Sequence, residues 1–170
     1  MSNKQLNVDD IDCVDQLNYE PLERKYIKVQ IIGAIFIYIL LLALPWFILL
    51  ANEFNHRTTL LVVMESVILI VGVINLCLLP KAYAYKGFAI REHDITYRSG
   101  IFFPSVVTIP FCKIQQVSIQ QSPISRIFNL YSVDVVNGAQ MLAETSIPGL
   151  TEKKANEIKT LLTERIKMDK

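Results

Sequence analysis

The residues of this chain that could carry chemistry include three basic side chains near the middle of the sequence, Arg98, Lys113 and Arg126. Guanidinium and ammonium groups bind phosphate and carboxylate through charge-assisted hydrogen bonds. The three residues are therefore candidate contacts for anionic lipid head groups or for an acidic partner. The alternative is structural: Arg126 hydrogen-bonds carbonyl groups inside its own domain, and Lys113 is only solvated.

Two polar residues interrupt a long apolar run, and they are candidates of a different kind. Glu65 is the one ionisable residue of the run, and Asn75 lies further along it. Polar groups inside a membrane segment mark an ion path or the face that binds another helix. Because Glu65 lies near one end of the run, its carboxylate can reach the interface. An assembly role for Glu65 and Asn75 is the preferred hypothesis, and a transport role for Glu65 is the alternative.

Catalytic, cofactor and metal motifs are absent from the sequence. None of the GxGxxG, GxxxxGK[ST], HExxH or GxSxG patterns occurs. Glu92, His93 and Asp94 form the nearest acid–base cluster, but three consecutive residues in a turn point in different directions. The three cysteines form no CxxC pair, and the two histidines are far apart. We therefore expect no enzyme, no cofactor and no metal site.

The overall composition of the chain is the average of two parts that differ in hydrophobicity and charge. The 170 residues are 52% hydrophobic and 19% charged, with a net charge of +1, which gives no reason to expect a nucleic-acid partner. Residues 29–51 carry no charge and residues 58–79 carry only Glu65, whereas the remainder has the ordinary composition of a soluble protein. A disordered chain, a collagen-like repeat and a disulfide scaffold are excluded.

The two apolar runs predict a membrane hairpin. A helix over residues 29–51 is about 35 Å long at roughly 1.5 Å per residue, enough to cross a hydrocarbon core of about 30 Å. Residues 58–79 form the second predicted transmembrane helix, and residues 52–57 form a short extracytoplasmic turn. So short a turn requires an antiparallel pair with both outer ends on one side of the membrane.

The basic residues predict which side that is. The turn contains only Arg57, whereas basic residues cluster before the first span and after the second, so the positive-inside rule places both termini in the cytoplasm. Residues 1–28 form an acidic N-terminal tail and juxtamembrane segment. We expect a flexible or partly ordered tail, and the functional alternative is a contact with a basic partner or with the basic face of the chain's own soluble domain. The flanking basic residues are Arg24, Lys25, Lys28, Lys81, Lys86 and Arg91.

Residues 80–170 predict a mainly β cytoplasmic domain. After Pro80 the apolar residues change from helical spacing to alternation, which is typical of strands. Turn residues separate these strands, and Pro148-Gly149 is expected to end the last one. The predicted strands lie near residues 88–90, 95–97, 101–109, 116–120, 131–135 and 143–147.

Two helices complete the predicted domain. Residues 123–128 read as a short helical turn, which Asn129 ends in a left-handed conformation. Thr151 caps a helix that runs to about Lys167. Its apolar stripe packs over the curled sheet, which gives a small barrel or sandwich closed by a C-terminal amphipathic helix. The stripe consists of Ala155, Ile158, Leu161, Leu162 and Ile166.

Several runs of the domain together resemble a known family. They are Arg98-Ser99-Gly100, the stretch IPFCKIQQV over 109–117, the stretch QSPISRIFNL over 121–130, Asn137-Gly138 and the stretch IPGL over 147–150. This combination resembles the membrane-flanked bacterial PH-like domain family of the YdbS type, over about residues 25–167. The family usually has arginine where Lys113 stands and glycine where Asn129 stands.

The resemblance implies a PH-like fold of two crossed sheets, held at the inner face of a bacterial cytoplasmic membrane, without enzymatic activity. The first hypothesis is a membrane-anchored interaction module that assembles with itself or with another PH-like membrane protein. The second is an anionic lipid head-group sensor that uses Lys113 and Arg126, and the third is a transport-complex subunit centred on Glu65.

Overall fold

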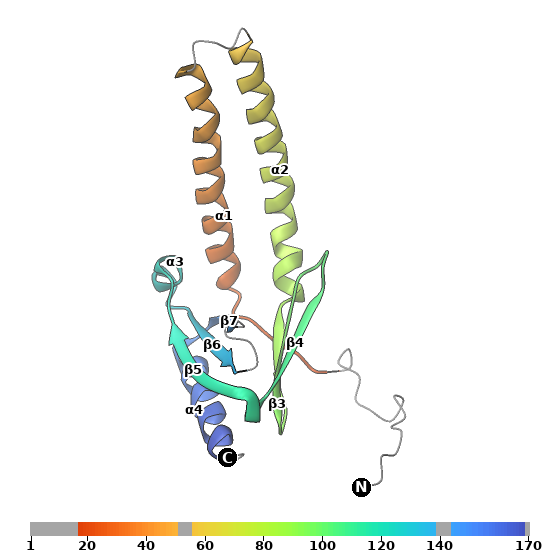
Figure 1. Cartoon of the computed structure of the whole chain (residues 1–170), viewed down its shortest axis with the longest axis vertical. Helices are drawn as coiled ribbons and strands as arrows, with labels where there is room; N and C mark the ends of the chain where they lie inside the picture. Colours follow the sequence, from red (N-terminus) through yellow and green to blue (C-terminus); the bar gives the residue numbers. More distant parts are fainter. Residues whose placement is uncertain (1–16, 51–55, 139–143, 169–170) are drawn as a thin grey trace, which may run out of the picture.

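The computed structural model describes residues 17–50, 56–138 and 144–168, and these form a pair of long helices standing on a β domain (Figure 1). Most of the predicted turn 52–57, the first sixteen residues of the acidic tail and the start of the strand predicted at 143 lie outside the described residues. The predicted fold class, an apolar helical hairpin with a mainly β domain and a C-terminal helix, is confirmed.

The first apolar helix differs from a single helix over 29–51. Helix α1 (Tyr26–Ala43) begins earlier, and the chain continues as the 3₁₀ helix η3 (Leu44–Leu50). Pro45 explains the change, because proline has no N–H to donate to a carbonyl group four residues back. The N–H of Leu44 already donates to the carbonyl oxygen of Leu41, three residues back, so the helix tightens there.

The second helix, α2 (Arg57–Tyr85), is longer than expected at its C-terminal end. The helix end expected at residue 79 is wrong, because the helix continues through Pro80 for five more residues, and the strand predicted near 88–90 follows it. Apolar helices tolerate an internal proline, since neighbouring helices and small local adjustments satisfy the freed backbone groups. Both helices are long and apolar enough to cross a membrane.

A four-stranded antiparallel sheet includes a strand from before the helices. Its order is β1-β2-β3-β4, where β1 is Glu20–Pro21, β2 is Gly87–Ile90, β3 is Asp94–Ser99 and β4 is Ser105–Pro110. In this sheet β1 pairs with β2, which follows α2 directly. The helical hairpin is thus an insertion between two neighbouring strands, and the domain predicted for 80–170 also includes residues 20–22.

The second sheet has three strands in the order β5-β6-β7. The 3₁₀ helix η4 (Phe111–Lys113) leads into β5 (Ile114–Gln120), and α3 (Pro123–Ile127) connects β5 to β6 (Tyr131–Asn137). Strand β7 (Glu144–Leu150) runs through Pro148-Gly149 instead of ending there, because an edge strand has no second partner that needs the missing proline N–H. The predicted left-handed Asn129 is confirmed, with φ of 52°.

The core lies between the two sheets and helix α4 (Glu152–Met168). Ala155, Ile158 and Leu162 of α4 are buried, as the stripe predicted, but Leu161 is 39% exposed. Leu161 lies next to Leu162 and therefore points about 100° away from it around the helix. The sheet residues of the core include Phe88, Ile95, Ile109, Phe111, Ile114, Val133, Val135, Ile147 and Leu150.

Candidate functional site

The junction between the helices and the domain is built around Arg98 of β3. Its guanidinium carbon lies 4.2 Å from the ring centroid of Tyr19 and 4.5 Å from that of Tyr85. Its Nε also donates a hydrogen bond to the carbonyl oxygen of Tyr85 at 3.1 Å. Arg98 thus joins the N-terminal segment, the sheet and the last residue of α2. The structure gives this residue intramolecular partners, and a contact of Arg98 with lipid stays a prediction.

Further contacts connect the start of α1 to the domain. The hydroxyl group of Tyr83 donates to the carbonyl oxygen of Leu22 at 2.6 Å, and the N–H of Glu23 donates to the carbonyl oxygen of Gly149 at 2.9 Å. A Cβ atom at Gly149 would lie 2.6 Å from the ring of Tyr26, so a side chain does not fit there. The helices therefore join the sheets without a flexible linker.

Two ionisable side chains on the domain side of the junction, Tyr97 and Lys86, are partly buried. Burial raises the pKa of Tyr97 to about 12, and the nearby Tyr26 adds to the rise. Burial also lowers the pKa of Lys86, whose Nζ lies 5.7 Å from the ring centroid of Tyr26. Both shifts disfavour the charged form, as expected where side chains have lost water.

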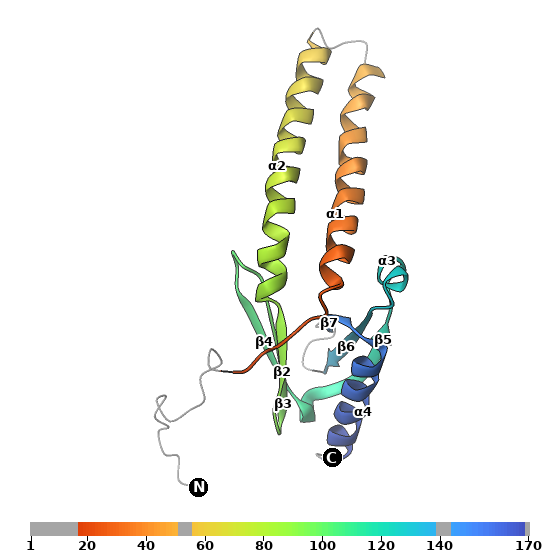
Figure 2. The ribbon, with the colours of Figure 1, turned by 180° about the vertical axis from the view of Figure 1, so that it is seen from behind.

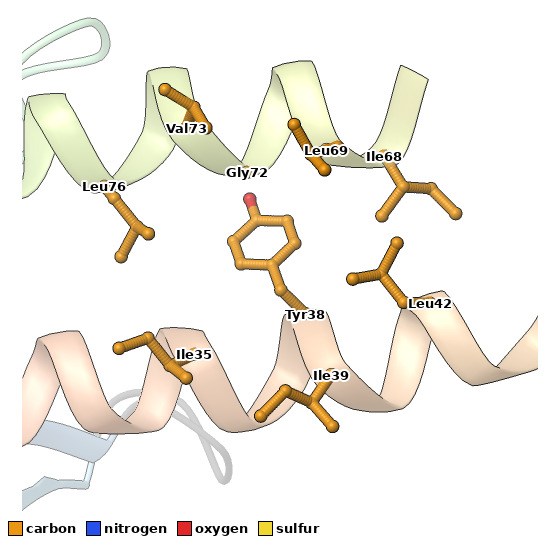
Figure 3. Close-up of a pocket in the computed structure, with 9 residues that line it drawn as sticks. All are labelled: Ile35, Tyr38, Ile39, Leu42, Ile68, Leu69, Gly72, Val73 and Leu76. Atoms are coloured by element: carbon orange, nitrogen blue, oxygen red, sulfur yellow. The ribbon is translucent and has the colours of Figure 1, made fainter. Parts of the chain in front are cut away.

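A groove of about 190 Å³ separates α1 from α2 within the apolar stretch. Figure 3 shows Tyr38 of α1 reaching across this groove to Gly72 of α2. A Cβ atom at Gly72 would lie only 3.2 Å from the Tyr38 ring, so glycine provides the room for the aromatic side chain. Aliphatic side chains line the rest of the groove: Ile35, Ile39, Leu42, Ile68, Leu69, Val73 and Leu76.

The two intramembrane candidates lie in different environments. Glu65 is half-buried and lies three and seven residues before Ile68 and Gly72, which places it on the side of α2 that faces α1. Asn75 is exposed, so its amide is available to a neighbouring helix. A third polar group was missed: Oε1 of Gln30 in α1 is buried and accepts no hydrogen bond within the described residues. The sequence does contain a sign of this group, because Gln30 is the one amide side chain near the start of an otherwise apolar run.

The other two basic candidates lie at opposite ends of the domain. Arg126 is exposed on α3, and Ile124 of the same short helix lies 3.8 Å from a Cβ built at Gly33 of α1. Lys113 is exposed in η4, at the bend between β4 and β5, which is the end of the domain away from the helices (Figure 1). The structure therefore does not bring Arg98, Lys113 and Arg126 together. Neither Lys113 nor Arg126 makes a side-chain hydrogen bond or ion pair within the described parts of the chain.

A polar cleft of about 350 Å³ lies on the three-stranded sheet. Asp134 of β6 is 4% exposed there, between Ser118 of β5 and Ser146 of β7 in the strand register. The other residues that line this cleft are Gln120, Gln121, Ser122 and Ser132. Across the described ranges, the structure contains no cluster of three or more metal-binding side chains.

The free edge of β4 is the last candidate surface. Strand β4 pairs with β3, and within the described strands nothing pairs with its other edge. The strand carries no charged residue, and its Val106 and Val107 are 39% and 38% exposed. Free strand edges are normally protected by charges, bulges or covering segments, because an uncovered edge pairs readily with another strand.

Comparison with known proteins gives matches at two levels. A family model described as "Bacterial PH domain" matches residues 25–166. The UPF0699 transmembrane protein YdbS of Bacillus subtilis (strain 168) is 28% identical over 98 residues, a stretch that covers 57% of this chain and 60% of YdbS. No solved structure matches the chain. The family match begins after β1 and includes both long helices, strands β2 to β7 and nearly all of α4.

Proposed function

The chain belongs to the bacterial PH domain family, and from this premise we propose that it is a non-enzymatic membrane-anchored module that assembles with a second copy of itself or with another PH-like membrane protein. In this proposal α1 and α2 cross the bacterial cytoplasmic membrane, and both termini are cytoplasmic. The basic residues that flank the two apolar runs support the orientation.

The observation that carries the proposal is the uncharged free edge of β4. The backbone N–H and C=O groups on this side of the strand have no strand partner among the described residues, and Val106 and Val107 add apolar surface next to them. A strand from a second molecule would satisfy these groups and cover the valines. Pairing of β4 with β4 is compatible with a two-fold axis, the commonest symmetry of homodimers.

The junction makes such pairing geometrically favourable. Because Arg98, Tyr83 and Gly149 hold the domain against the helices, every copy in one membrane presents β4 at the same height. The exposed Asn75 of α2 supplies a second contact, since intramembrane amides hydrogen-bond to neighbouring helices. Anchoring in one plane also raises the effective concentration of the partners.

Size measurement after chemical cross-linking in native membranes tests assembly. The wild-type chain is expected to give a cross-linked dimer or a complex with another PH-like protein, and to elute above monomer size in mild detergent. Val107→Lys should abolish this complex, because it places a charge on the pairing edge. Leu161→Lys is the matched control, because Leu161 is 39% exposed but lies on α4, and it should leave the complex intact. A monomer at every concentration, with no co-purifying protein, contradicts the proposal.

Reporter fusions test the orientation separately. A fusion at the C-terminus of a reporter that is active only in the cytoplasm is expected to be active. The same reporter inserted between residues 52 and 55 is expected to be inactive. The opposite pattern contradicts the proposed topology without affecting the assembly proposal.

Contact with anionic lipid is the second candidate function, and the position of Arg126 favours it. Arg126 is exposed on α3, which packs against α1 near the start of the apolar run. A head-group contact should depend on anionic lipid and weaken with salt, because salt screens exposed charges. Arg126→Gln should reduce binding of anionic lipid to the purified full chain, whereas Lys113→Gln, at the other end of the domain, should not.

A further inference from the structure

The loop between β3 and β4 exposes two adjacent phenylalanine side chains. Phe102 is 70% exposed and Phe103 is 88% exposed, although aromatic rings are among the costliest side chains to leave in water. The loop is a tight turn, because Gly100 has φ of 83° and a Cβ atom there would collide with the carbonyl oxygen of Phe103. The fold therefore holds both rings away from the core in a fixed turn.

A third exposed apolar side chain belongs to α3, on the other side of the helix pair. Ile127 of α3 is 75% exposed, and Ile124 of the same helix packs 3.8 Å from a Cβ built at Gly33. Gly33 follows Val29, the first residue of the uncharged run, by four residues, or about 6 Å along a helix. The exposed Ile127 therefore belongs to a short helix that packs on the start of the apolar run of α1.

The β3–β4 loop and α3, which we call the two tips of the domain, project in the same direction. Figures 1 and 2 show the β3–β4 loop rising past the lower end of α2, and α3 rising past the lower end of α1 on the opposite side. Exposed basic side chains belong to the neighbouring segments: Arg126 to α3, Lys25 to the N-cap of α1, Lys28 to its first turn, and Lys81 to the last part of α2. Aromatic and basic residues together are characteristic of the membrane interface.

We propose that the PH-like domain inserts Phe102, Phe103 and Ile127 into the cytoplasmic interface of the same bilayer that α1 and α2 cross. Lipid is the expected contact of both tips, because they lie beside the ends of the two apolar helices, where exposed basic residues also occur. Arg126 contacts the head-group phosphates next to Ile127. The proposal goes beyond assembly through β4: it fixes the tilt of the domain, so that the end with Lys113 stays in water.

Site-specific fluorescence on the full chain tests this proposal. Phe103→Cys and Ile127→Cys are each made in a chain whose Cys13, Cys77 and Cys112 are replaced by serine. The control keeps the native Cys112, which is exposed at the bend after β4, at the end of the domain away from the helices. Each single cysteine carries an environment-sensitive dye, and the purified chain is reconstituted into vesicles of mixed zwitterionic and anionic phospholipid.

The expected result separates the tips from the control. Dyes at 103 and 127 are quenched by a nitroxide placed near the lipid head groups, and aqueous iodide quenches them several-fold less than it quenches the dye at 112. Both differences persist in high salt, because insertion of apolar side chains does not depend on screened charges. The replaced side chains are exposed, so the variants are expected to fold, which unchanged elution in detergent verifies.

Two results would overturn the proposal. In one, the dyes at 103 and 127 are as accessible to iodide as the dye at 112 and do not respond to the lipid nitroxide. In the other, they are shielded from iodide but insensitive to the nitroxide, which means that a protein surface covers the tips. Repeating the measurement with Val107→Lys keeps the result independent of assembly, since insertion requires only one copy.

Discussion

Pro21 and Gly87 lie opposite each other in antiparallel strands, although both long helices separate them along the chain. The hairpin therefore leaves the sheet at β1 and returns to it at β2. A Cβ atom at Gly87 would lie 3.0 Å from Cβ of Tyr19 and 3.1 Å from the carbonyl oxygen of Glu20, so the strands approach closely there. A shift of the helices relative to each other must be transmitted to this strand pair, or break it.

Leu22 is expected to stabilise the domain although it precedes both helices. It is 3% exposed and belongs to the core, so Leu22→Ala should lower the free energy of unfolding by about 2–5 kcal/mol. Leu161→Ala is the matched control, since Leu161 is 39% exposed, and it should cost about 0.5 kcal/mol or less. Thermal unfolding of the full chain in detergent measures both. Equal midpoints for the two variants would show that residues before α1 do not belong to the core.

Arg98 is expected to be irreplaceable by lysine at the junction. An ammonium group cannot stack on Tyr19 and Tyr85 at once while donating to the Tyr85 carbonyl oxygen, so Arg98→Lys should destabilise the chain by about 1–2 kcal/mol. The N-terminal segment should also become more sensitive to proteolysis. Arg126→Lys is the control and should change neither readout. Wild-type stability and protease resistance in Arg98→Lys would contradict the assigned role.

Gly72 is expected to set the spacing of α1 and α2. Gly72→Leu places a side chain where the Tyr38 ring lies, and such overpacking typically costs about 1–3 kcal/mol. Val71→Leu adds volume one residue earlier, at a position that is 51% exposed, and should be tolerated. The efficiency of disulfide formation between cysteines introduced at Ile39 and Leu69, with the native cysteines replaced by serine, reports the spacing. Unchanged cross-linking in Gly72→Leu argues against close packing of Tyr38 on Gly72.

Tyr97 is expected to make the fold sensitive to alkaline pH. Its pKa is raised from an ordinary value of 10.0 to about 12, so the unfolded chain loses the proton at lower pH than the folded chain. The contribution to stability is fully present below pH 10 and is lost as the pH rises toward 12. Absorbance titration of tyrosinate in the full chain should show a late component that Tyr97→Phe removes. A wild-type titration identical to that of Tyr97→Phe would be incompatible with a buried phenol.

Much of the local structure follows from short-range chemistry. The alternation around Val117 and Ile119 predicts a strand, and β5 is found there. The α3 helix is fixed locally by Pro123 at its start and by Ser122, whose Oγ accepts a hydrogen bond from the N–H of Ser125 at 3.2 Å. Such features depend on neighbours within a few residues, so a single sequence contains the information.

The errors occur where distant residues decide the outcome. Proline usually ends a helix, but α2 continues past Pro80, and its last turn reaches the N-terminal segment through the hydrogen bond from Tyr83 to Leu22. Glu20 lies in the predicted acidic tail, and only the fold shows that its carboxylate pairs with Nζ of Lys154 at 2.8 Å. Neither contact leaves a pattern in the sequence, because each joins segments on opposite sides of the hairpin.

The amino-acid sequence is sufficient to predict the two parts of this protein: two apolar runs long enough to cross a bilayer and an alternating domain closed by an amphipathic helix. Those properties follow from the solvent preference and the spacing of side chains, which act locally. The folded structure was needed to show that the hairpin interrupts a sheet, that Arg98 is held between two tyrosine rings, and that the segments with Phe103 and Ile127 flank the helices. These relationships depend on which surfaces meet when the chain is folded, and chain positions far apart meet only through packing.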